Sequence, residues 1–374
     1  MKIRVERDTL ADAVAWAART LPSRPSLPVL AGLVLTAEGD SLTLSSFDYE
    51  VSARVAISAD IEIPGTTLVS GRLLADIARS LPGAPVNLVS EGTRIVLTCG
   101  RSSFTLPTLP VEDYPQLPAM PQSSGEINAA VFAEAVAQVA IAAGKDDTLP
   151  TLTGIRMEIE GQSITLAATD RYRLAVRNFT WSPTTSSIST QALIPARTLA
   201  DTAKALANAE GVTLALAQAG EGLIGFEGNG RRTTTRLLDG EFPKYRSLLP
   251  SESAGIATIE IAALADAVKR VALVAERNTP VRLAFEGSEV ILRAGAGEDA
   301  QANEAVESVL DGDDIEIAFN PTYLLDGLAA LDAPYVRMSF TQSTRPAVLT
   351  GAADPSSELR DDYRYLLMPV RLTG

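Results

Sequence analysis

The stretch Thr165-Leu166-Ala167-Ala168-Thr169-Asp170-Arg171-Tyr172-Arg173-Leu174-Ala175-Val176 decides how this chain is organised. It is an apolar run that breaks at Thr169-Asp170 and continues as a basic, aromatic run, which predicts two strands joined at a tight break. The segment that leads into it, Pro150 to Asp170, aligns without a gap on Pro28 to Asp48, and nine of the 21 positions are identical. This self-similarity predicts an internally repeated fold.

A second motif gives the period of the repeat. Leu74-Ala75-Asp76, Leu199-Ala200-Asp201 and Leu324-Leu325-Asp326 follow one another at intervals of 125 residues, so three repeats account for the 374-residue chain. A repeat of this length is too long for a solenoid, whose unit has about 20–50 residues. We therefore expect three small domains, at 1–119, 126–250 and 255–374.

Each repeat is predicted to hold two helices backed by antiparallel, alternating strands, which makes the fold class α+β. The expected helices are Leu10–Arg19, Arg72–Leu81, Ala130–Ala143, Arg197–Leu206, Leu264–Ala275 and one around Leu324–Leu331. Asp8 or Thr9 is expected to cap the first helix. In the first repeat the expected strands are Lys2–Arg7, Val29–Ala37, Ser41–Phe47, Tyr49–Ile57, Val86–Ser90, Arg94–Thr98 and Ser103–Leu109. Near the C-terminus, Pro369 predicts an edge strand, because proline removes a ladder hydrogen bond.

The charge of the chain is strongly acidic, with a net value of −14. Taken alone this argues against a nucleic-acid partner, since phosphate binding usually requires a basic surface. The predicted helices are nearly neutral, with seven basic and eight acidic residues, so the acidic excess lies in strands and loops. A local face lined by helices therefore remains compatible with phosphate binding.

The cysteine and histidine content limits the chemistry that this chain can perform. The chain has one cysteine, Cys99, and no histidine. Without a second cysteine no disulfide forms within the chain, which fits a reducing compartment. Without histidine the Ser-His-Asp triad, the Cys-His pair and the His-ligated zinc site are excluded. No apolar run approaches the ~18 residues of a membrane span, so we expect a cytoplasmic protein with no membrane partner.

No motif predicts an active site. Gly220-Glu221-Gly222-Leu223-Ile224-Gly225 matches the dinucleotide pattern G-x-G-x-x-G, but a strand and a hairpin turn are expected to follow it instead of a helix. Asp146-Asp147 and the acidic residues at 311–314 are interpreted as solvated loop charge. We therefore expect a protein without catalytic activity, metal or cofactor.

Several motifs together make the chain resemble the bacterial sliding clamps, the beta subunits of DNA polymerase III, over its full length. They are Arg24-Pro25-Ser26-Leu27-Pro28-Val29-Leu30, Ala168-Thr169-Asp170-Arg171-Tyr172-Arg173-Leu174-Ala175, Asp239-Gly240-Glu241-Phe242-Pro243-Lys244-Tyr245, Phe319-Asn320-Pro321-Thr322-Tyr323-Leu324 and Met368-Pro369-Val370-Arg371-Leu372. The resemblance implies three DNA-clamp domains per chain and a head-to-tail homodimer closed into a six-domain ring around double-stranded DNA, without sequence specificity.

The resemblance also implies partners and their binding residues. The partners would be the DNA polymerase III alpha subunit, a clamp loader, and other polymerases and repair proteins that carry clamp-binding peptides. The peptide pocket would use Leu152, Thr169, Arg173, Leu174, Pro243, Leu248, Asn320, Tyr323, Leu366, Leu367, Met368, Pro369, Val370 and Arg371.

Two further sets of residues follow from the resemblance. DNA contact would fall on Arg24, Arg72, Lys145 and Arg197. The joint between the two chains would use Phe104 and Leu106 against Leu273, with Arg94 and Arg101 facing Glu298, Glu304 and Glu307.

Two alternatives to a DNA-encircling processivity clamp stay open on the sequence. One is a repeat scaffold that binds only proteins. The other is a carboxylate enzyme built on a cluster such as Asp146-Asp147. Retention on circular DNA separates the first alternative from the clamp, and turnover that is lost in Asp146→Asn would support the second.

Overall fold

The structure is a computed structural model and describes residues 1–217, 222–275, 279–295, 300–357 and 360–371. Its contacts divide the chain into two compact units. The first unit holds Met1–Phe132, Ser182–Thr185 and Asp201–Leu237, and the second holds Ala133–Trp181, Ser186–Ala200 and Leu238–Gly374. The middle repeat thus contributes elements to both units.

The elements confirm that one pattern is used three times: a strand, a helix, several strands, a second helix and three final strands. The first repeat has β1 (Lys2–Val5), α1 (Arg7–Ala17), β2 (Gly32–Glu38), β3 (Ser41–Phe47), β4 (Val51–Ser58), β5 (Asp60–Ile63), β6 (Gly65–Ser70), α2 (Gly71–Ser80), β7 (Val86–Glu91), β8 (Arg94–Cys99) and β9 (Ser102–Leu109).

The second repeat has β10 (Ser123–Asn128), α3 (Ala129–Ala140), β11 (Gly154–Glu160), β12 (Ser163–Thr169), β13 (Arg173–Thr180), β14 (Ser182–Pro183), β15 (Ser189–Pro195), α4 (Ala196–Leu206), β16 (Gly211–Leu216), β17 (Leu223–Gly228) and β18 (Arg231–Arg236). The third has β19 (Gly255–Glu260), α5 (Ile261–Val271), β20 (Val281–Glu286), β21 (Glu289–Ala294), β22 (Ala302–Asp311), β23 (Ile315–Phe319), α6 (Pro321–Ala330), β24 (Tyr335–Phe340), β25 (Ala347–Ala352) and β26 (Tyr363–Leu367).

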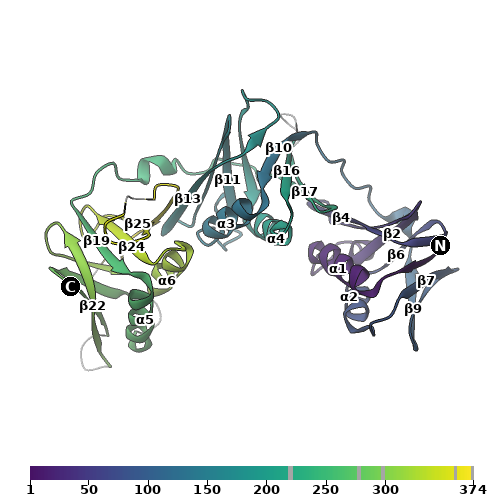
Figure 1. Cartoon of the computed structure of the whole chain (residues 1–374), viewed down its shortest axis with the longest axis horizontal. Helices are drawn as coiled ribbons and strands as arrows, with labels where there is room; N and C mark the ends of the chain where they lie inside the picture. Colours follow the sequence, from purple (N-terminus) through teal and green to yellow (C-terminus); the bar gives the residue numbers. More distant parts are fainter. Residues whose placement is uncertain (218–221, 276–278, 296–299, 358–359, 372–374) are drawn as a thin grey trace. The chain divides into compact units, whose positions relative to one another are not determined.

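All pairs of neighbouring strands are antiparallel in the described residues. The first unit holds one sheet in the order β14-β10-β16-β17-β18-β4-β3-β2-β6-β9-β8-β7-β1-β5, and the second holds one in the order β15-β11-β12-β13-β26-β25-β24-β19-β22-β21-β20-β23. The helices of the first repeat, α1 and α2, pack against each other (Figure 1). Leu10 and Val14 of α1 are fully buried with Leu35 and Leu44 of the sheet, which confirms the predicted apolar face of this helix.

Neighbouring repeats are joined by strand pairing. The fourth strand of the first repeat, β4, pairs with the last strand of the second, β18, from Val51–Thr235 to Val55–Arg231. The fourth strand of the second repeat, β13, pairs in the same way with the last strand of the third, β26, from Arg173–Leu367 to Arg177–Tyr363. The same joint is therefore built twice within one chain.

Two strands, the last strand of the first repeat and the fourth strand of the third repeat, have no partner of this kind within the described residues, and each has an open edge. The last strand of the first repeat, β9, pairs through residues 102–107 only with β8. The fourth strand of the third repeat, β22, pairs through residues 302–307 only with β21. Among the described residues, no strand covers the other edge of either segment, so unpaired backbone groups are presented there.

Three sequence-based predictions are wrong. Helix α1 starts at Arg7, and its N-cap is Glu6 without a side-chain cap, so neither Asp8 nor Thr9 caps it. Pro28–Ala31 form a 3₁₀ turn before β2, where a strand from Val29 was predicted; proline fits the first position of such a turn. The first helix of the third repeat ends at Val271, ahead of a 3₁₀ turn at Ala272–Val274.

The C-terminal strand is also placed differently from its prediction. β26 lies between β13 and β25 and is an interior strand, not an edge strand. Pro369 causes no lost ladder bond, because the strand ends at Leu367, two residues before it. The segment 222–230 behaves as predicted: β17 follows Gly222 directly and leads into the β17–β18 hairpin, with no helix.

The strand break at Thr169-Asp170 and its equivalent in the first repeat have the same geometry. Tyr49 and Arg171, which are equivalent in the alignment, both have left-handed backbone, with φ of 77° and 79°. Asp48 accepts hydrogen bonds from the N–H groups of Glu50 and Val51 at 3.0 and 2.8 Å. A carboxylate that accepts from the N–H groups two and three residues further on forms an Asx-type turn, which explains why aspartate stands at the break.

Tyr114 locks the break of the first repeat and gives a test of this packing. Its hydroxyl accepts from the N–H of Phe47 at 2.7 Å and donates to the carbonyl of Phe47 at 3.3 Å. Burial raises the pKa of Tyr114 to about 12, with the charge of Asp48 as a lesser cause. The folded state therefore favours the neutral phenol, and this stabilisation is complete below pH ~10 and lost as the pH rises through about 12.

We predict that Tyr114→Phe lowers the free energy of unfolding by about 1 kcal/mol at pH 7, the usual loss for one hydrogen-bonded hydroxyl. Urea titrations at pH 7 and pH 11 should also show a smaller alkaline loss of stability in the variant. Phe242 holds the matching position in the second repeat, and Phe242→Leu serves as a packing control with an unchanged pH profile. Identical pH profiles for Tyr114→Phe and the native chain would contradict the assignment.

Candidate functional site

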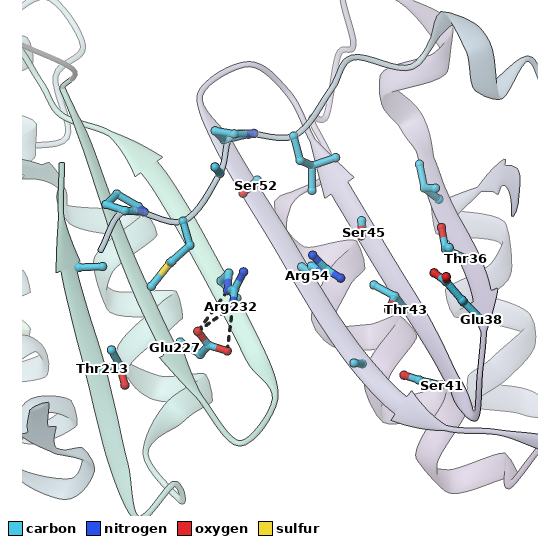
Figure 2. Close-up of a pocket in the computed structure, with 18 of the residues that line it drawn as sticks. Thr36, Glu38, Ser41, Thr43, Ser45, Ser52, Arg54, Thr213, Glu227 and Arg232 are labelled. Carbon is cyan, nitrogen blue, oxygen red and sulfur yellow. Dashed lines mark hydrogen bonds and ion pairs between the residues drawn. The ribbon is translucent and has the colours of Figure 1, made fainter. Parts of the chain in front are cut away.

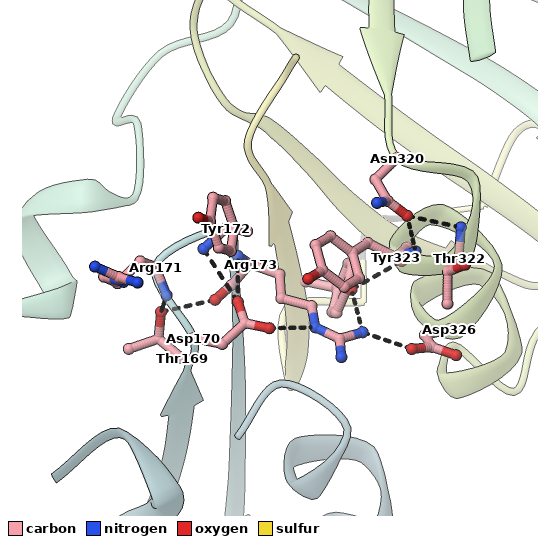
Figure 3. A network of polar contacts seen from close by, with 10 residues as sticks. Thr169, Asp170, Arg171, Tyr172, Arg173, Asn320, Thr322, Tyr323 and Asp326 are labelled. Atoms are coloured by element: carbon pink, nitrogen blue, oxygen red, sulfur yellow. Dashed lines mark hydrogen bonds and ion pairs between the residues drawn. The ribbon is translucent and has the colours of Figure 1, made fainter. Parts of the chain in front are cut away.

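The break in the second repeat is held by two side chains, those of Asp170 and Thr169. Asp170 accepts hydrogen bonds from the N–H groups of Tyr172 and Arg173 at 3.0 and 3.1 Å. The Thr169 hydroxyl donates to the carbonyl of Arg173 at 2.7 Å and accepts from the N–H of Arg171 at 3.2 Å. Figure 3 shows how these bonds fold the chain back on itself at the start of β13. The turn leaves Arg171 and Tyr172 exposed and turns Arg173 inward.

Arg173 is the centre of the polar network in Figure 3. Its side chain is only 6% exposed. Its Nε donates to Asp170 at 3.0 Å, and one terminal nitrogen donates to Asp326 on α6 at 2.6 Å. A buried guanidinium is tolerated when carboxylates pair with it and accept its hydrogen bonds. The network therefore ties the second repeat to the third through one arginine.

The electrostatics of the network keep Arg173 charged. Burial opposes the charged form, but the hydrogen bonds to Asp326 and Tyr365 and the charge of Asp170 outweigh it, so the pKa of Arg173 is raised. Burial also raises the pKa of Tyr365, whose neutral hydroxyl donates to the carbonyl of Tyr323 at 2.8 Å. Neither group titrates near neutral pH, so the network is a fixed structural element.

Helix α6 supplies the aromatic side of the site. Asn320 caps the helix by accepting from the N–H groups of Thr322 and Tyr323 at 2.9 and 3.2 Å, and Pro321 takes the first helical position. This cap fixes Tyr323, whose ring lies 4.3 Å below the Arg173 guanidinium carbon and stacks on Tyr172 with centroids 6.2 Å apart. Cation–π contact and stacking together orient both rings.

The C-terminal segment passes beside this cluster. The N–H of Met368 donates to the carbonyl of Tyr172 at 2.9 Å, and the N–H of Val370 donates to that of Ala318 at 2.8 Å. The side chains of Met368 and Val370 nevertheless stay 39% and 36% exposed. An extended backbone held on both sides with apolar side chains left accessible is suited to contact a partner.

A cavity of about 510 Å³ lies between the break and α6. It is lined by Ala143, Gly144, Lys145, Asp146, Leu149, Leu152, Asp170, Arg171, Tyr172, Arg173, Thr322, Tyr323 and Asp326. Its size and its mixture of aromatic and polar walls are typical of a ligand or peptide site.

The structure brings part of the predicted pocket together here. Leu152, Arg173 and Tyr323 line the cavity, while Thr169 and Asn320 hold its walls by the bonds described above. The side chains of Leu174, Leu366 and Leu367 are buried, the first two within the apolar cluster that backs the joint. Pro243, Leu248, Met368, Val370 and Arg371 are exposed and Pro369 is half-buried, and none of these six lines the cavity.

Nine of the thirteen cavity residues were not predicted as site residues, and four of these carry the polar and aromatic groups described above: Asp170, Arg171, Tyr172 and Asp326. The sequence held a signal for each of them. Asp170, Arg171 and Tyr172 lie within the break motif itself, and Asp326 closes the Leu-Leu-Asp motif that gave the repeat period. What the sequence lacked was the contact between Arg173 and Asp326, which are 153 residues apart.

The residues predicted to contact DNA are all exposed. Arg72 donates to the carbonyl of Pro22 at 3.1 Å, which places α2 beside the loop that carries Arg24. Arg197 lies in the first turn of α4. Lys145, in contrast, lies on the rim of the cavity. Within the described residues, none of these four forms an ion pair with an acidic side chain.

The residues predicted for the joint between chains have mixed placements. Arg94 and Arg101 are exposed and Leu273 is 83% exposed. Leu106 is only 1% exposed and packs in the core of the first repeat, and Phe104 is half-buried against the same core.

The acidic residues of this predicted joint belong to the third repeat. Glu304 accepts from Arg270 of its own chain at 3.0 Å, while Glu307 is exposed. Glu298 lies outside the described residues. Both described residues are on the part of β22 that has an open edge.

The first unit has a larger cavity, of about 1090 Å³, which none of the predicted site residues lines. Figure 2 shows its floor, the outward face of β2, β3 and β4 with its hydroxyl side chains, and the ion pair between Arg232 and Glu227 at 2.9 Å. Among the described residues, no cluster of acidic, cysteine or histidine side chains could hold a metal, and no helix could span a membrane.

Comparison with known proteins identifies similar chains. Residues 1–118, 126–244 and 246–371 match the N-terminal, central and C-terminal domains of the DNA polymerase III beta subunit. The chain is 63% identical to the beta sliding clamp of Streptomyces coelicolor over 100% of both chains. It is 45% identical to the beta sliding clamp homolog GriR of Streptomyces muensis over 99% of both.

Solved structures show the same similarity. The DNA polymerase sliding clamp of Bacillus subtilis matches with a TM-score of 0.92 and 26% identity over 100% of both chains. The sliding clamp of Pseudomonas aeruginosa bound to griselimycin matches with a TM-score of 0.92 and 28% identity, again over 100% of both.

We predict that Arg173→Met lowers the free energy of unfolding by about 2–4 kcal/mol, because two carboxylates at the joint would lose their cation. Lys269→Met breaks the exposed pair with Asp266 on α5 and should cost less than about 1 kcal/mol. Urea unfolding of both variants measures the difference. Equal stability of the two variants would show that the Arg173 network does not hold the joint.

Proposed function

Because the chain belongs to the DNA polymerase III beta subunit family, we propose that it is a sliding clamp, a processivity factor whose ring encircles duplex DNA and tethers the replicative polymerase. The observation that carries the proposal is the strand joint that is built twice within the chain and left open at both ends.

The open edges support closure by a second copy. In each joint within the chain, the fourth strand of one repeat pairs with the last strand of the next. The third repeat has an open fourth strand, β22, and the first repeat has an open last strand, β9. Pairing β22 of one chain with β9 of its partner makes the third joint, head to tail. Two such joints close a homodimer of six repeats, which removes every open edge of this kind.

Charge supports the same pairing. The open segment of β22 presents Glu307, with Glu304 beside it, and the β8–β9 hairpin presents Arg94 and Arg101. Opposite charges across an interface favour the correct partner and register. Leu273, whose side chain is 83% exposed in the single chain, supplies an apolar group of the kind that interfaces bury.

A ring of this kind needs no catalytic group, and we propose that the chain is an accessory subunit without one. It works by topology: a closed ring stays on DNA without binding it tightly. The six α-helices of the described residues carry seven basic and seven acidic side chains, against a net charge of −14 for the chain. Weak phosphate contacts, from Arg24, Arg72 and Arg197, would permit sliding.

The cavity at the second joint and the exposed C-terminal segment form the proposed partner site. We propose that short peptides from the DNA polymerase III alpha subunit, the clamp loader, other polymerases and repair proteins bind here in the cytoplasm. Tethering raises the effective concentration of the polymerase at its template without new contacts to DNA. The contacts would come from the stacked rings of Tyr172 and Tyr323, from the accessible side chain of Met368 and from the cationic side chains of Lys145 and Arg171.

The ring predicts a topological form of DNA binding. Clamps loaded onto a nicked circular plasmid by a clamp loader should remain through gel filtration and be lost when the plasmid is linearised, because only an open end lets a ring slide off. Thr105→Pro should abolish retention. The N–H of Thr108 donates to the carbonyl of Thr93, just before β8, so by alternation the N–H of Thr105 faces the open edge, where proline cannot donate.

Thr105→Val, which keeps the N–H, is the control for this experiment and should be retained like the native chain. Equal loss of the native chain from circular and linear DNA would refute the ring and favour a scaffold that binds only proteins.

The C-terminal segment predicts a separable loss of partner binding. Deletion of residues 368–374 should reduce binding of the polymerase alpha subunit by more than about tenfold and leave the dimer intact, because the deletion removes Met368 to Arg371 from the proposed partner site and leaves β9 and β22 unchanged. Surface plasmon resonance and light scattering measure the two properties. Ile63→Ala, which trims an exposed apolar residue of β5, is the control. Normal polymerase binding by the truncated chain would refute the assignment.

A further inference from the structure

The cavity at the joint between the second and third repeats has two cationic side chains on its rim, in addition to the paired arginine on its floor. Arg173, on the floor, is already paired with Asp170 and Asp326. Lys145 and Arg171, on the rim, are exposed, and neither forms an ion pair within the described residues. The rim therefore offers free positive charge to whatever enters the cavity.

Arg171 occupies a backbone position that favours glycine. Its φ of 79° lies in the left-handed region, which is unfavourable for residues with a Cβ and free of cost for glycine. Strain of this kind often marks a residue whose side chain is used. The same turn in the first repeat carries Tyr49 at φ 77°, so the strained backbone belongs to the fold, while the cation belongs to this copy alone.

The Arg171 side chain continues the aromatic wall of the cavity. Its guanidinium carbon lies 5.9 Å from the centre of the Tyr172 ring. Tyr172 stacks on Tyr323, and Tyr172 is still 53% exposed. The site thus places a free cation at the edge of an accessible aromatic surface. A carboxylate next to an apolar or aromatic side chain complements both features at once.

We propose that Arg171, assisted by Lys145, makes the cavity selective for partner peptides that carry an aspartate or glutamate beside their apolar anchor. The proposal rests on the proposed function, because it names the chemistry of the peptides that the same site would bind. It also assigns Lys145 to peptide recognition in addition to the DNA contact expected from the sequence.

Asp146 is an acidic side chain on the same rim, and its charge interacts with that of Arg171. Asp146 accepts hydrogen bonds from the N–H and the hydroxyl of Thr148 at 3.0 and 2.6 Å. Those bonds, and to a lesser degree the charge of Arg171, lower the pKa of Asp146, so it is ionised at neutral pH. Since Thr148 already satisfies this carboxylate, Arg171 stays available to a peptide, and Asp146→Asn should strengthen the preference for acidic peptides.

The test is an aspartate scan in the full-length chain. The probe is a fluorescein-labelled peptide that copies the clamp-binding segment of the cognate polymerase alpha subunit, with each position in turn set to Asp or to Asn. Fluorescence anisotropy gives the ratio of the two affinities. For the native chain we expect Asp to bind about three- to tenfold more tightly than Asn at one or more positions next to an apolar residue. This ratio should fall as salt screens the contact.

Two variants of the same turn separate recognition from structure. Arg171→Gly should reduce the Asp-to-Asn ratio to below about twofold without lowering Tm, since glycine relieves the left-handed strain. Tyr49→Gly makes the matching change in the first repeat and should leave the ratio unchanged. Lys145→Gln should reduce the ratio partly.

Three outcomes would overturn the proposal. One is an Asp-to-Asn ratio near one at every position while the parent peptide still binds. Another is an unchanged ratio in Arg171→Gly. The third is a parent peptide that does not bind the native chain, which would also refute the partner site itself. A Lys145→Gln variant that loses DNA retention but keeps the ratio would overturn the role of Lys145 in peptide recognition.

Discussion

Hydrogen bonding between the strand edges of neighbouring repeats is the constraint on which the rest of this structure depends. Each repeat alone has a fourth strand and a last strand with an edge to cover. Within the chain, β18 covers β4 and β26 covers β13. These joints turn three small domains into two continuous sheets, and they also decide where the cavity forms and which two edges remain for a partner chain.

The two joints share a scaffold but differ in chemistry. Both breaks use an aspartate that holds the next N–H groups and a residue with left-handed backbone. In the second joint the next residue is Arg173, which crosses to Asp326 on α6 and stacks on Tyr323. In the first joint the equivalent residue is Val51, which has no charge to pair. The same strand break therefore serves as scaffold in the first joint and as the wall of a cavity in the second.

Local features of the fold could be predicted from the sequence. Hydrophobic periodicity and turn residues, which act over a few positions, predicted the helices at Gly71–Ser80 and Ala196–Leu206 and the β7–β8 hairpin. The 125-residue period followed from the recurrence of one short motif. Helix α1 begins at Arg7 without a side-chain cap, so the N-cap preference for aspartate and threonine did not predict its first residue.

Features that depend on distant partners could not be predicted in this way. Whether β26 is an interior strand depends on β13, almost 200 residues earlier in the sequence. Leu106 lies on the core side of β9 together with Phe104, opposite the exposed Thr105, and only the resemblance had assigned it to the joint between chains. Asp326 was visible as a repeat marker, and only the fold shows that it neutralises Arg173. The proposed partner site was therefore inferred from the resemblance, and the charge balance of its residues required the structure.

The central claim is that the joint built twice within the chain is built again between two chains, and the mass of the protein in solution tests it most directly. Sedimentation velocity at micromolar concentration should give a single species with twice the 39.4 kDa mass of the chain, and Thr105→Pro should give the monomer. A stable monomer of the native chain, or an open series of growing oligomers, would contradict a closed head-to-tail ring.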